Sequence, residues 1–238
     1  MYNTHMLMNL TIGQTNPIPV HDHTVPVPRT VKELEPIVGG LSKPSKMPGY
    51  STSTPAQRCA TGSKLRNVKG SVCSGCYALK GCYVFPVVKD ALEARFHALK
   101  DPRWTAAFIA LLNRKRVEYF RWHDSGDIQS VNHLRNICIV AENTPDTLHW
   151  LPTREYRIVD DYILQYGSLP ENLVVRASAH MIGRAAPARF AHSSMVLAKG
   201  ETDHPTASVC PAPDQGNACG DCRSCWDRNV ETVAYRYH

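Results

Sequence analysis

The chain has 238 residues, a formal net charge of +6 and 43% hydrophobic residues, so it can bury a core of its own in one large domain or two small ones. It has no run of about 18 apolar residues, which excludes a membrane-spanning helix. The stretch MYNTHMLMNL at its start lacks the basic and apolar regions of a signal peptide, so we expect a protein of the reducing cytoplasm. The nine cysteines are therefore candidate metal ligands rather than disulfide partners.

Residues 1–45 are predicted to form an extended N-terminal arm, and residues 46–238 a single domain. Prolines interrupt any helical pattern in the arm at Pro17, Pro19, Pro26, Pro28, Pro36 and Pro44. The run His21, Asp22 and His23 contains potential metal ligands, but in a proline-rich arm it is interpreted as polar surface.

A loop rich in turn residues is predicted over residues 46–85. It contains Cys59, Cys73, Cys76 and Cys82, spaced C-x13-C-x2-C-x5-C, and shows no period of 2 or 3.6. Thiolates of this kind hold zinc or an iron–sulfur cluster. Cys82 borders an apolar run, so it is either a fourth ligand or a small buried side chain. Three ligands would leave one metal position open for chemistry, whereas four would close the site.

Helix and strand patterns alternate from about residue 86 onward. Helices are predicted over 86–99, 103–117, 130–143 and 159–167, with Cys138 on the apolar side of the third. Strands are predicted near the starts of 118–130, 147–157 and 171–181, and 193–200 is predicted to be the last strand. The alternation indicates an α/β fold with a parallel sheet, either a partial (β/α) barrel or an open sheet, with the cysteine-rich loops at the carboxyl ends of the strands.

Polar residues follow each predicted strand, and in parallel α/β folds these loops carry the functional groups. We expect one rim to be formed by His123, Asp124, Ser125, Gly126, Asp127, Thr153, Arg154, Glu155, Arg176, Ser178, His180 and Lys199. His123 with Asp124 or Asp127 would act as a general base with its orienting carboxylate, or the two carboxylates would bind a divalent ion.

Arginines on this rim suit a phosphate or carboxylate ligand. Arg154 and Arg176 would bind it by paired hydrogen bonds. We predict the catalytic residues Asp124, Asp127, His123 and Arg154, and the substrate contacts Arg176, Ser178, Thr153, Glu155 and Lys199. The alternative is a structural network of ion pairs, for example between Arg154 and Asp127.

The C-terminal stretch 209–227 has the strongest metal-binding pattern. Cys210, Cys219, Cys222 and Cys225 lie within sixteen residues, and the last three are spaced C-x2-C-x2-C. This spacing is typical of a [4Fe–4S] cluster, and a tetrahedral zinc site is the alternative. Together with the first loop, the chain offers thiols for one or two clusters.

Basic residues are concentrated between Arg58 and Arg121, where 13 Lys or Arg residues stand against 4 Asp or Glu. A surplus of this kind favours a phosphate-bearing partner, so we expect nucleic acid to bind and no membrane contact. The alternative is a solvated basic face without a partner.

The segments GSVCSGCYALKG, RWHDSGDI, WLPTREY and NLVVRASAHM, followed by CGDCRSCW, resemble the phage protein family named after gene product 88. The resemblance runs from about residue 46 to 227 and implies a phage protein, and hence the cytoplasm of a bacterial host, but no particular reaction.

A fainter similarity, carried by CSGCYA, HDSGD, PTRE and RASA in the same order, is to phage proteins with a radical-SAM-like barrel. It implies a partial (β/α) barrel with an iron–sulfur cluster at its mouth and S-adenosylmethionine on an open iron. The chain departs from the C-x3-C-x2-C pattern of those proteins, because Cys59, Cys73 and Cys76 are spaced differently, and it lacks a glycine-rich GGE-type turn. Both departures argue against radical chemistry.

Three functions remain in view. The first is an iron–sulfur enzyme acting on nucleic acid or a nucleotide, by redox or radical-SAM-like chemistry. The second is a nucleic-acid-binding module in which zinc or iron–sulfur sites are purely structural. The third is a redox-sensing regulator with an exposed cluster.

Overall fold

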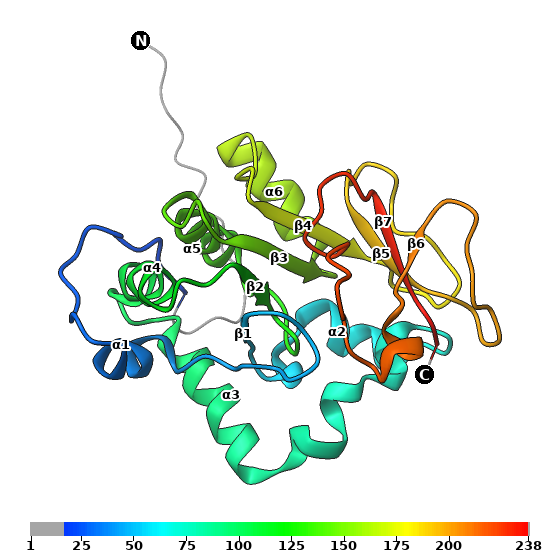
Figure 1. Cartoon of the computed structure of the whole chain (residues 1–238), viewed down its shortest axis with the longest axis horizontal. Coiled ribbons are helices and arrows are strands. Elements are labelled where there is room, and N and C mark those ends of the chain that lie inside the picture. Colours follow the sequence, from blue (N-terminus) through cyan, green and yellow to red (C-terminus); the bar gives the residue numbers. More distant parts are fainter. Residues whose placement is uncertain (1–16, 238) are drawn as a thin grey trace.

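The computed structural model describes residues 17–237, and its strands form one open, fully parallel sheet (Figure 1). The order across the sheet is β1-β2-β3-β4-β5-β7-β6, with β1 and β6 at the edges, and an isolated antiparallel bridge joins Ser51 of β1 to Ser42. The strands are β1 Tyr50–Thr52, β2 Tyr119–Trp122, β3 Leu148–Thr153, β4 Leu173–Ser178, β5 Ser193–Val196, β6 Ser208–Val209 and β7 Thr232–Tyr235. The predicted α/β fold with an open parallel sheet is confirmed.

Local sequence signals set the ends of the helices. The helices are α1 Val31–Val38, α2 Ala60–Leu65, α3 Pro86–Ala98, α4 Trp104–Lys115, α5 Val131–Glu142 and α6 Tyr156–Tyr166. Pro86 begins α3, where a missing N–H costs nothing. The Ser130 hydroxyl caps α5 by accepting a hydrogen bond from the His133 N–H at 3.1 Å. In the part of the chain that the structure describes, no helix is both long and apolar enough to span a bilayer.

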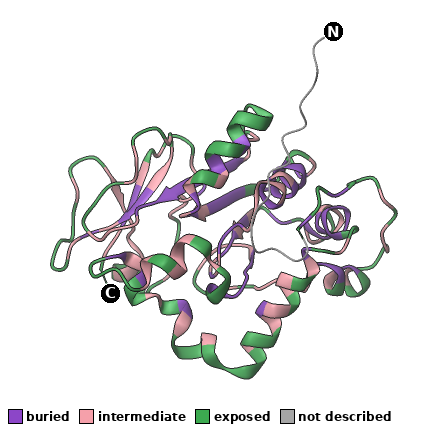
Figure 2. Ribbon diagram, turned by 180° about the vertical axis from the view of Figure 1, so that it is seen from behind, coloured by how far each residue is buried: buried purple, intermediate pink, exposed green. Residues whose placement is uncertain are grey.

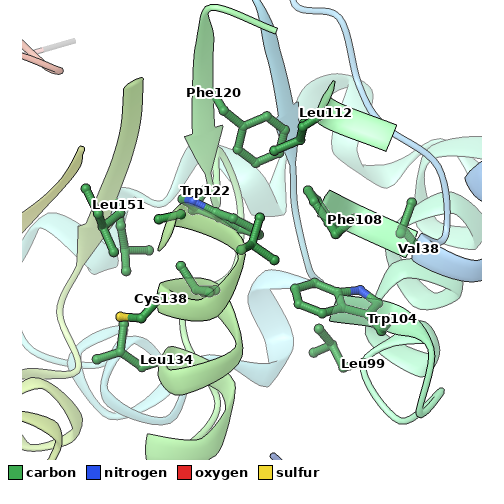
Figure 3. Packing of buried hydrophobic residues seen from close by; sticks show 14 of the residues in the cluster. Val38, Leu99, Trp104, Phe108, Leu112, Phe120, Trp122, Leu134, Cys138 and Leu151 are labelled. Carbon is green, nitrogen blue, oxygen red and sulfur yellow. The ribbon is translucent and has the colours of Figure 1, made fainter. Parts of the chain in front are cut away.

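The first five strands follow one another across the sheet in chain order. Because crossovers between parallel strands are right-handed, consecutive winding puts the connecting helices on the same face. One core cluster joins Phe108 of α4, Phe120 and Trp122 of β2, Leu134 of α5 and Leu151 of β3 (Figure 3). The winding is therefore consecutive from β1 to β5, and of the two predicted alternatives the open sheet is the one observed.

The C-terminal segment covers the opposite face of the sheet. Phe120 is buried in the core, whereas its neighbours Tyr119 and Arg121 alternate with it and point to the other face. There the Trp226 ring packs edge-to-face on Tyr119 and Trp150, with centroid separations of 5.5 and 5.2 Å. The Trp226 indole also donates a hydrogen bond to the Phe120 carbonyl at 3.0 Å. The chain after β6 thus returns across this face before it enters β7.

The prediction of an extended arm over residues 1–45 is partly wrong. Residues 1–16 lie outside the described part, but Val31–Val38 form helix α1 despite Pro36. The Thr30 hydroxyl caps α1 by accepting from the Glu33 N–H at 3.3 Å, and Gly39 ends it at φ 75°. Capping and burial against α4 therefore outweigh the proline signal.

His21 is buried, so the interpretation of this residue as polar surface is wrong. Its main-chain N–H donates to the Asn136 side-chain oxygen at 2.9 Å, and its ring Nδ1 lies 3.0 Å from the Thr105 hydroxyl. These two partners belong to α5 and α4, so the arm packs on both helices.

Residues 193–200 are not the last strand. β5 begins at Ser193, but β6 and β7 follow it, and β7 lies between β5 and β6. β1 lies inside the predicted loop of residues 46–85. β1 and β6, of three and two residues, are too short to show a period in the sequence. β7 is as long as β5, but it follows the cysteine-rich segment, where no further strand was predicted.

Candidate functional site

The turn after β2 is fixed against the end of β1. The Thr54 N–H donates to the Ser125 carbonyl at 3.1 Å, and the Ser125 hydroxyl donates back to the Thr54 carbonyl at 2.8 Å. Gly126 has φ 79°, and a Cβ there would lie 2.0 Å from the Thr54 hydroxyl oxygen. His123 has a positive φ of 58°, and its N–H donates to the Thr52 carbonyl at 2.9 Å. The predicted polar turn is therefore a rigid part of the sheet edge.

Asp127 links the ends of β2 and β3. Its carboxylate accepts hydrogen bonds from the Thr153 hydroxyl at 2.6 Å, the Ile128 N–H at 2.8 Å and the Arg154 main-chain N–H at 2.9 Å. Burial raises the pKa of this carboxyl to about 6, although the hydrogen bonds act in the opposite direction. Among the described residues Asp127 and Arg154 form no ion pair, so that alternative is wrong in its detail, but the Arg154 main chain does bond to the carboxylate.

Glu155 connects this edge to the first cysteine-rich loop. Its oxygens accept hydrogen bonds from the Thr61 N–H at 2.7 Å and the Thr61 hydroxyl at 2.6 Å. Thr61 lies in the first turn of α2, and Cys59, which precedes that helix, gives it no side-chain cap. The Glu155 N–H donates to the Thr153 hydroxyl at 3.1 Å. Asp127, Thr153 and Glu155 thus form one hydrogen-bonded chain that holds α2 at the sheet edge.

Cys59, Cys73 and Cys76 lie together beside this chain of hydrogen bonds. A Cβ on Gly62 would be 3.7 Å from both the Cys59 and the Cys73 sulfur, so the two thiols flank the same glycine. Burial raises the pKa of the Cys59 thiol, and nearby negative charges, Cys76 and Cys73 among them, raise it further. Burial likewise raises the pKa of Cys73, while Arg154 acts to lower it. The three thiols therefore share one neighbourhood at the carboxyl edge.

Cys82 differs from these three thiols in its exposure, because it lies in solvent whereas Cys73 is buried and Cys59 and Cys76 are half-buried. Cys138 is fully buried in the core, as predicted.

Several polar atoms at the ends of β1, β2 and β3 are buried without a hydrogen-bond partner: the hydroxyls of Ser53 and Thr54, Asp124 Oδ1, His123 Nδ1, Arg121 Nε and Arg154 Nε. Unpaired buried groups are costly, so their concentration marks a place where a ligand would supply partners. Burial raises the pKa of the Asp124 carboxyl, while Arg121 and Arg95 act to lower it.

His123 is neutral at pH 7. Burial lowers its pKa to about 3, and the positive charge of Arg121 contributes in the same direction. Its ring lies edge-to-face with that of His133 at a centroid separation of 5.4 Å. An imidazole that binds a proton so weakly is a poor general base, so this environment favours a hydrogen-bonding role for His123.

Arg121 lies between the two cysteine-rich segments, and the sequence reasoning missed it. Burial lowers the pKa of its guanidinium, but surrounding acidic groups, which include Tyr77 and Cys225, more than offset this effect. Tyr77 follows Cys76 of the first thiol group, and its hydroxyl donates a hydrogen bond to the Asp124 carbonyl, although the residue as a whole is largely exposed. The available signal was an arginine inside a short, otherwise apolar strand.

The remaining predicted rim residues are dispersed. The His180 ring stacks on Tyr156 at 4.3 Å between centroids, and its Nε2 lies 3.1 Å from the Arg154 carbonyl. The buried Ser178 hydroxyl accepts a hydrogen bond at 3.0 Å from a serine of β5, and Lys199 is exposed on the loop after that strand. Of these three residues, only His180 bonds to a residue beside Asp127 and the first group of thiols, namely Arg154.

All the hydrogen bonds of the Arg176 guanidinium go to main-chain carbonyls inside the protein, so the prediction that Arg176 binds substrate is wrong. Its side chain is fully buried on the face of β4 that the C-terminal segment covers. Its guanidinium donates, at 2.7–3.4 Å, to the carbonyls of Ser193, Ser224, Cys225, Asp227, Val230 and Glu231. Arg176 therefore holds the second cysteine-rich segment on the sheet.

Cys210, Cys219, Cys222 and Cys225 form a second neighbourhood of thiols. Burial raises the pKa of Cys219, and the charges of Cys210 and Cys222 raise it further. Burial raises the pKa of Cys225 to about 11, while a hydrogen bond with Tyr235, whose hydroxyl lies 3.3 Å from the sulfur, acts to lower it. The charges of these thiols thus act on one another's pKa along this segment.

Within residues 17–237, no three His, Cys, Asp or Glu side chains already converge closely enough to hold a metal ion. Binding would require the thiols of each neighbourhood to turn toward a shared centre. Their chemistry suits that step, because grouped sulfur donors are what zinc and iron–sulfur clusters use.

A family model described as Gene product 88 matches residues 29–228, a range that contains both cysteine-rich segments and every strand except β7. Neither a curated protein nor a solved structure matches the chain.

Proposed function

The chain belongs to the phage gene product 88 family, and we propose that it is an iron–sulfur enzyme acting on nucleic acid or a nucleotide in the bacterial host cytoplasm. The observation that carries this proposal is the unequal grouping of the thiols. Three gather at the carboxyl edge of the sheet and four gather on the segment that follows β6. A four-thiol site is closed and suits electron transfer, whereas a three-thiol site leaves one metal position for a ligand.

Residues of the chain would act around the open position. Cys59, Cys73 and Cys76 would hold a [4Fe–4S] cluster, which supplies an electrophilic iron or an electron when bound. Arg154 has a buried Nε without a hydrogen-bond partner and would donate to a phosphate of the substrate, whereas the unpaired Asp124 Oδ1 would accept a hydrogen bond from a substrate O–H or N–H group. S-adenosylmethionine is a chemically suitable ligand for such an iron, but the missing GGE-type turn speaks against it.

The second candidate is a nucleic-acid-binding module with structural zinc. It is favoured by the way Asp127, Thr153 and Glu155 bond to one another, because groups already paired in a structural role are not free for catalysis. In that case Arg176 and the C-terminal thiols would serve only to fasten the last segment to the sheet.

Metal content separates the two candidates. We expect anaerobically purified protein to be brown, with about four iron and sulfide per chain for one cubane cluster or about eight for two. Cys219→Ser and Cys59→Ser should each lose iron, while Cys82→Ser serves as the matched control and should keep the full content. A colourless protein with zinc and no iron in every preparation would refute the iron–sulfur proposal in favour of the module.

Catalysis is tested separately from metal binding. Asp124→Asn keeps the side-chain shape but removes the charge, so it should retain iron and lose turnover of a nucleic-acid or nucleotide substrate. Full activity of this variant would show that the carboxylate has no catalytic role.

A further inference from the structure

Large apolar side chains are exposed where the first cysteine-rich loop runs into α3. Tyr77 and Phe85 are each 57% exposed, and Val84 and Val87 are 42% and 73% exposed. The segment protrudes from the body of the molecule and is coloured largely as exposed in Figure 2. Residues 77–87, called here the 77–87 surface, thus present aromatic and aliphatic groups together, which marks an interaction site.

The 77–87 surface is also positively charged. Lys80 lies within it and Lys89 follows it on α3, and both are exposed. Neither forms an ion pair with any of the described residues. The nearest acidic residues along the chain are Asp90, which is exposed, and Glu93, which is already bonded to Arg58 at 2.8 Å. Two free cations thus accompany the exposed rings.

We propose that the 77–87 surface binds single-stranded nucleic acid, with bases stacked on Phe85 and Tyr77 and backbone phosphates on Lys80 and Lys89. Exposed aromatic rings combined with lysines are the recurring elements of such sites, since every base has a stacking face and every nucleotide carries a phosphate. This inference rests on the proposed function, because Tyr77 follows Cys76 directly and a strand held here would lie beside the three-thiol group.

The lysines and the exposed rings together argue against two other occupants of this surface, a second copy of the chain and a nucleic-acid duplex. A second copy placed symmetrically on this surface would bring Lys80 and Lys89 toward the same lysines of its partner, which costs free energy. A duplex keeps its bases stacked inside, so it would satisfy the lysines but leave the rings without partners. A single strand satisfies both.

Substitutions at Phe85 distinguish stacking from general apolar contact. Binding of a fluorescent single-stranded oligonucleotide, followed by anisotropy, should weaken about tenfold or more in Phe85→Ala. Phe85→Leu keeps an apolar side chain without a π face and should weaken similarly, whereas Phe85→Trp should bind as well as the wild type. Leu164→Ala on α6, where the leucine is 88% exposed, is the matched control and should bind normally. Wild-type binding by Phe85→Leu would overturn the stacking assignment.

The lysines are tested through salt dependence. Lys80→Gln combined with Lys89→Gln should reduce the slope of log affinity against log salt by about 1.4, because each phosphate contact to a single strand contributes about 0.7. Lys32→Gln on α1 removes an exposed lysine elsewhere and should leave the slope unchanged. Equal slopes in the double variant and the wild type would overturn the role of these lysines.

Running the same titrations on iron-loaded and metal-free protein separates this inference from the proposed function. If protein that never contains iron binds the oligonucleotide through Phe85, the inference holds and the proposed iron–sulfur function is refuted. If the protein contains iron but binds no single-stranded oligonucleotide, only the inference is refuted. A third outcome is a wild-type protein that binds no oligonucleotide but forms concentration-dependent dimers or binds anionic vesicles. If Phe85→Ala abolishes that dimerisation or vesicle binding, the surface has a different occupant and the inference is overturned.

Discussion

At the scale of single residues, buried neutral histidines make stability depend on pH. His149 is fully buried, its Nδ1 accepts a hydrogen bond from the Trp122 indole at 3.2 Å, and its Nε2 lies 2.9 Å from the Thr144 hydroxyl. Burial lowers its pKa to about 3, whereas a histidine in the unfolded chain titrates near 6.5. As pH falls, the unfolded chain takes up this proton first. The contribution of His149 to stability is therefore complete above about pH 6.5 and is lost progressively down to about pH 3.

Denaturant unfolding between about pH 7.5 and pH 5 measures this effect. Below about pH 6.5, His149 should lower the free energy of unfolding by about 1.4 kcal/mol per pH unit. His149→Gln should lose that part of the slope, while His97→Gln, which alters an exposed histidine of α3, should keep it. Parallel curves for the wild type and His149→Gln would contradict the prediction.

Arg176 should matter for folding and for retention of the C-terminal thiols. Arg176→Met leaves several buried carbonyls without a donor, which should lower the free energy of unfolding by at least about 3 kcal/mol. Arg176→Lys keeps the charge but has fewer donors, so its free energy of unfolding should lie between those of the wild type and Arg176→Met. Arg189→Lys changes an exposed arginine and should stay within about 0.5 kcal/mol. Urea unfolding with metal analysis provides both readouts, and an unaffected Arg176→Met protein would refute the structural role.

Residue type and spacing predicted the grouping of the thiols but not the roles of the arginines. Short C-x2-C gaps keep sulfurs close whatever the fold, so Cys219, Cys222 and Cys225 could be named as joint ligands from the sequence, and metal binding by them stays a prediction. Arg176 and Arg121 sit on a strand face whose covering segment comes from far along the chain. Their partners depend on tertiary contacts that no local pattern encodes.

At the scale of elements, Glu155 should control the order of α2 and the accessibility of Cys59. Glu155→Ala removes both hydrogen bonds to Thr61, and α2 has no side-chain cap of its own, so stability should fall by about 1–2 kcal/mol. Glu155→Gln can still accept from the Thr61 N–H and donate to its hydroxyl, so it should behave nearly as the wild type.

Reaction with a thiol reagent on metal-free protein measures the consequence at Cys59. The Cys59 thiol should react faster in Glu155→Ala than in the wild type or Glu155→Gln, while the exposed Cys82 should react at the same rate in all three. Equal Cys59 rates in Glu155→Ala and the wild type would show that α2 is held by other contacts.

Longer elements were predictable because their patterns repeat over several turns or residues. The helices α3, α4 and α5 start or end at recognisable signals such as Pro86 and Ser130. Helix α1 was missed because Pro36 lies inside it, and β1 and β6 were missed because two or three residues show no periodicity. β7, which is as long as β5, was missed after the cysteine-rich segment. These missed strands border the cysteine-rich segments, so the candidate site was harder to derive than the core.

At the scale of the whole molecule, bound metal should stabilise two loops without holding the core together. The main core cluster joins α1, α4, α5 and α6 to the inner faces of β2, β3 and β4, and Cys138 is its one cysteine. A chain of this length can bury enough apolar surface to fold without metal. Anaerobic removal of metal by a chelator should therefore increase amide exchange in residues 59–76 and 210–225 and leave the exchange of β2, β3 and β4 unchanged. Hydrogen exchange read by mass spectrometry on loaded and stripped protein tests this, with Cys82→Ser expected to follow the wild type. If removal of the metal also reduced protection in β2, β3 and β4, the prediction would be wrong. The core would then need the bound metal in order to stay folded.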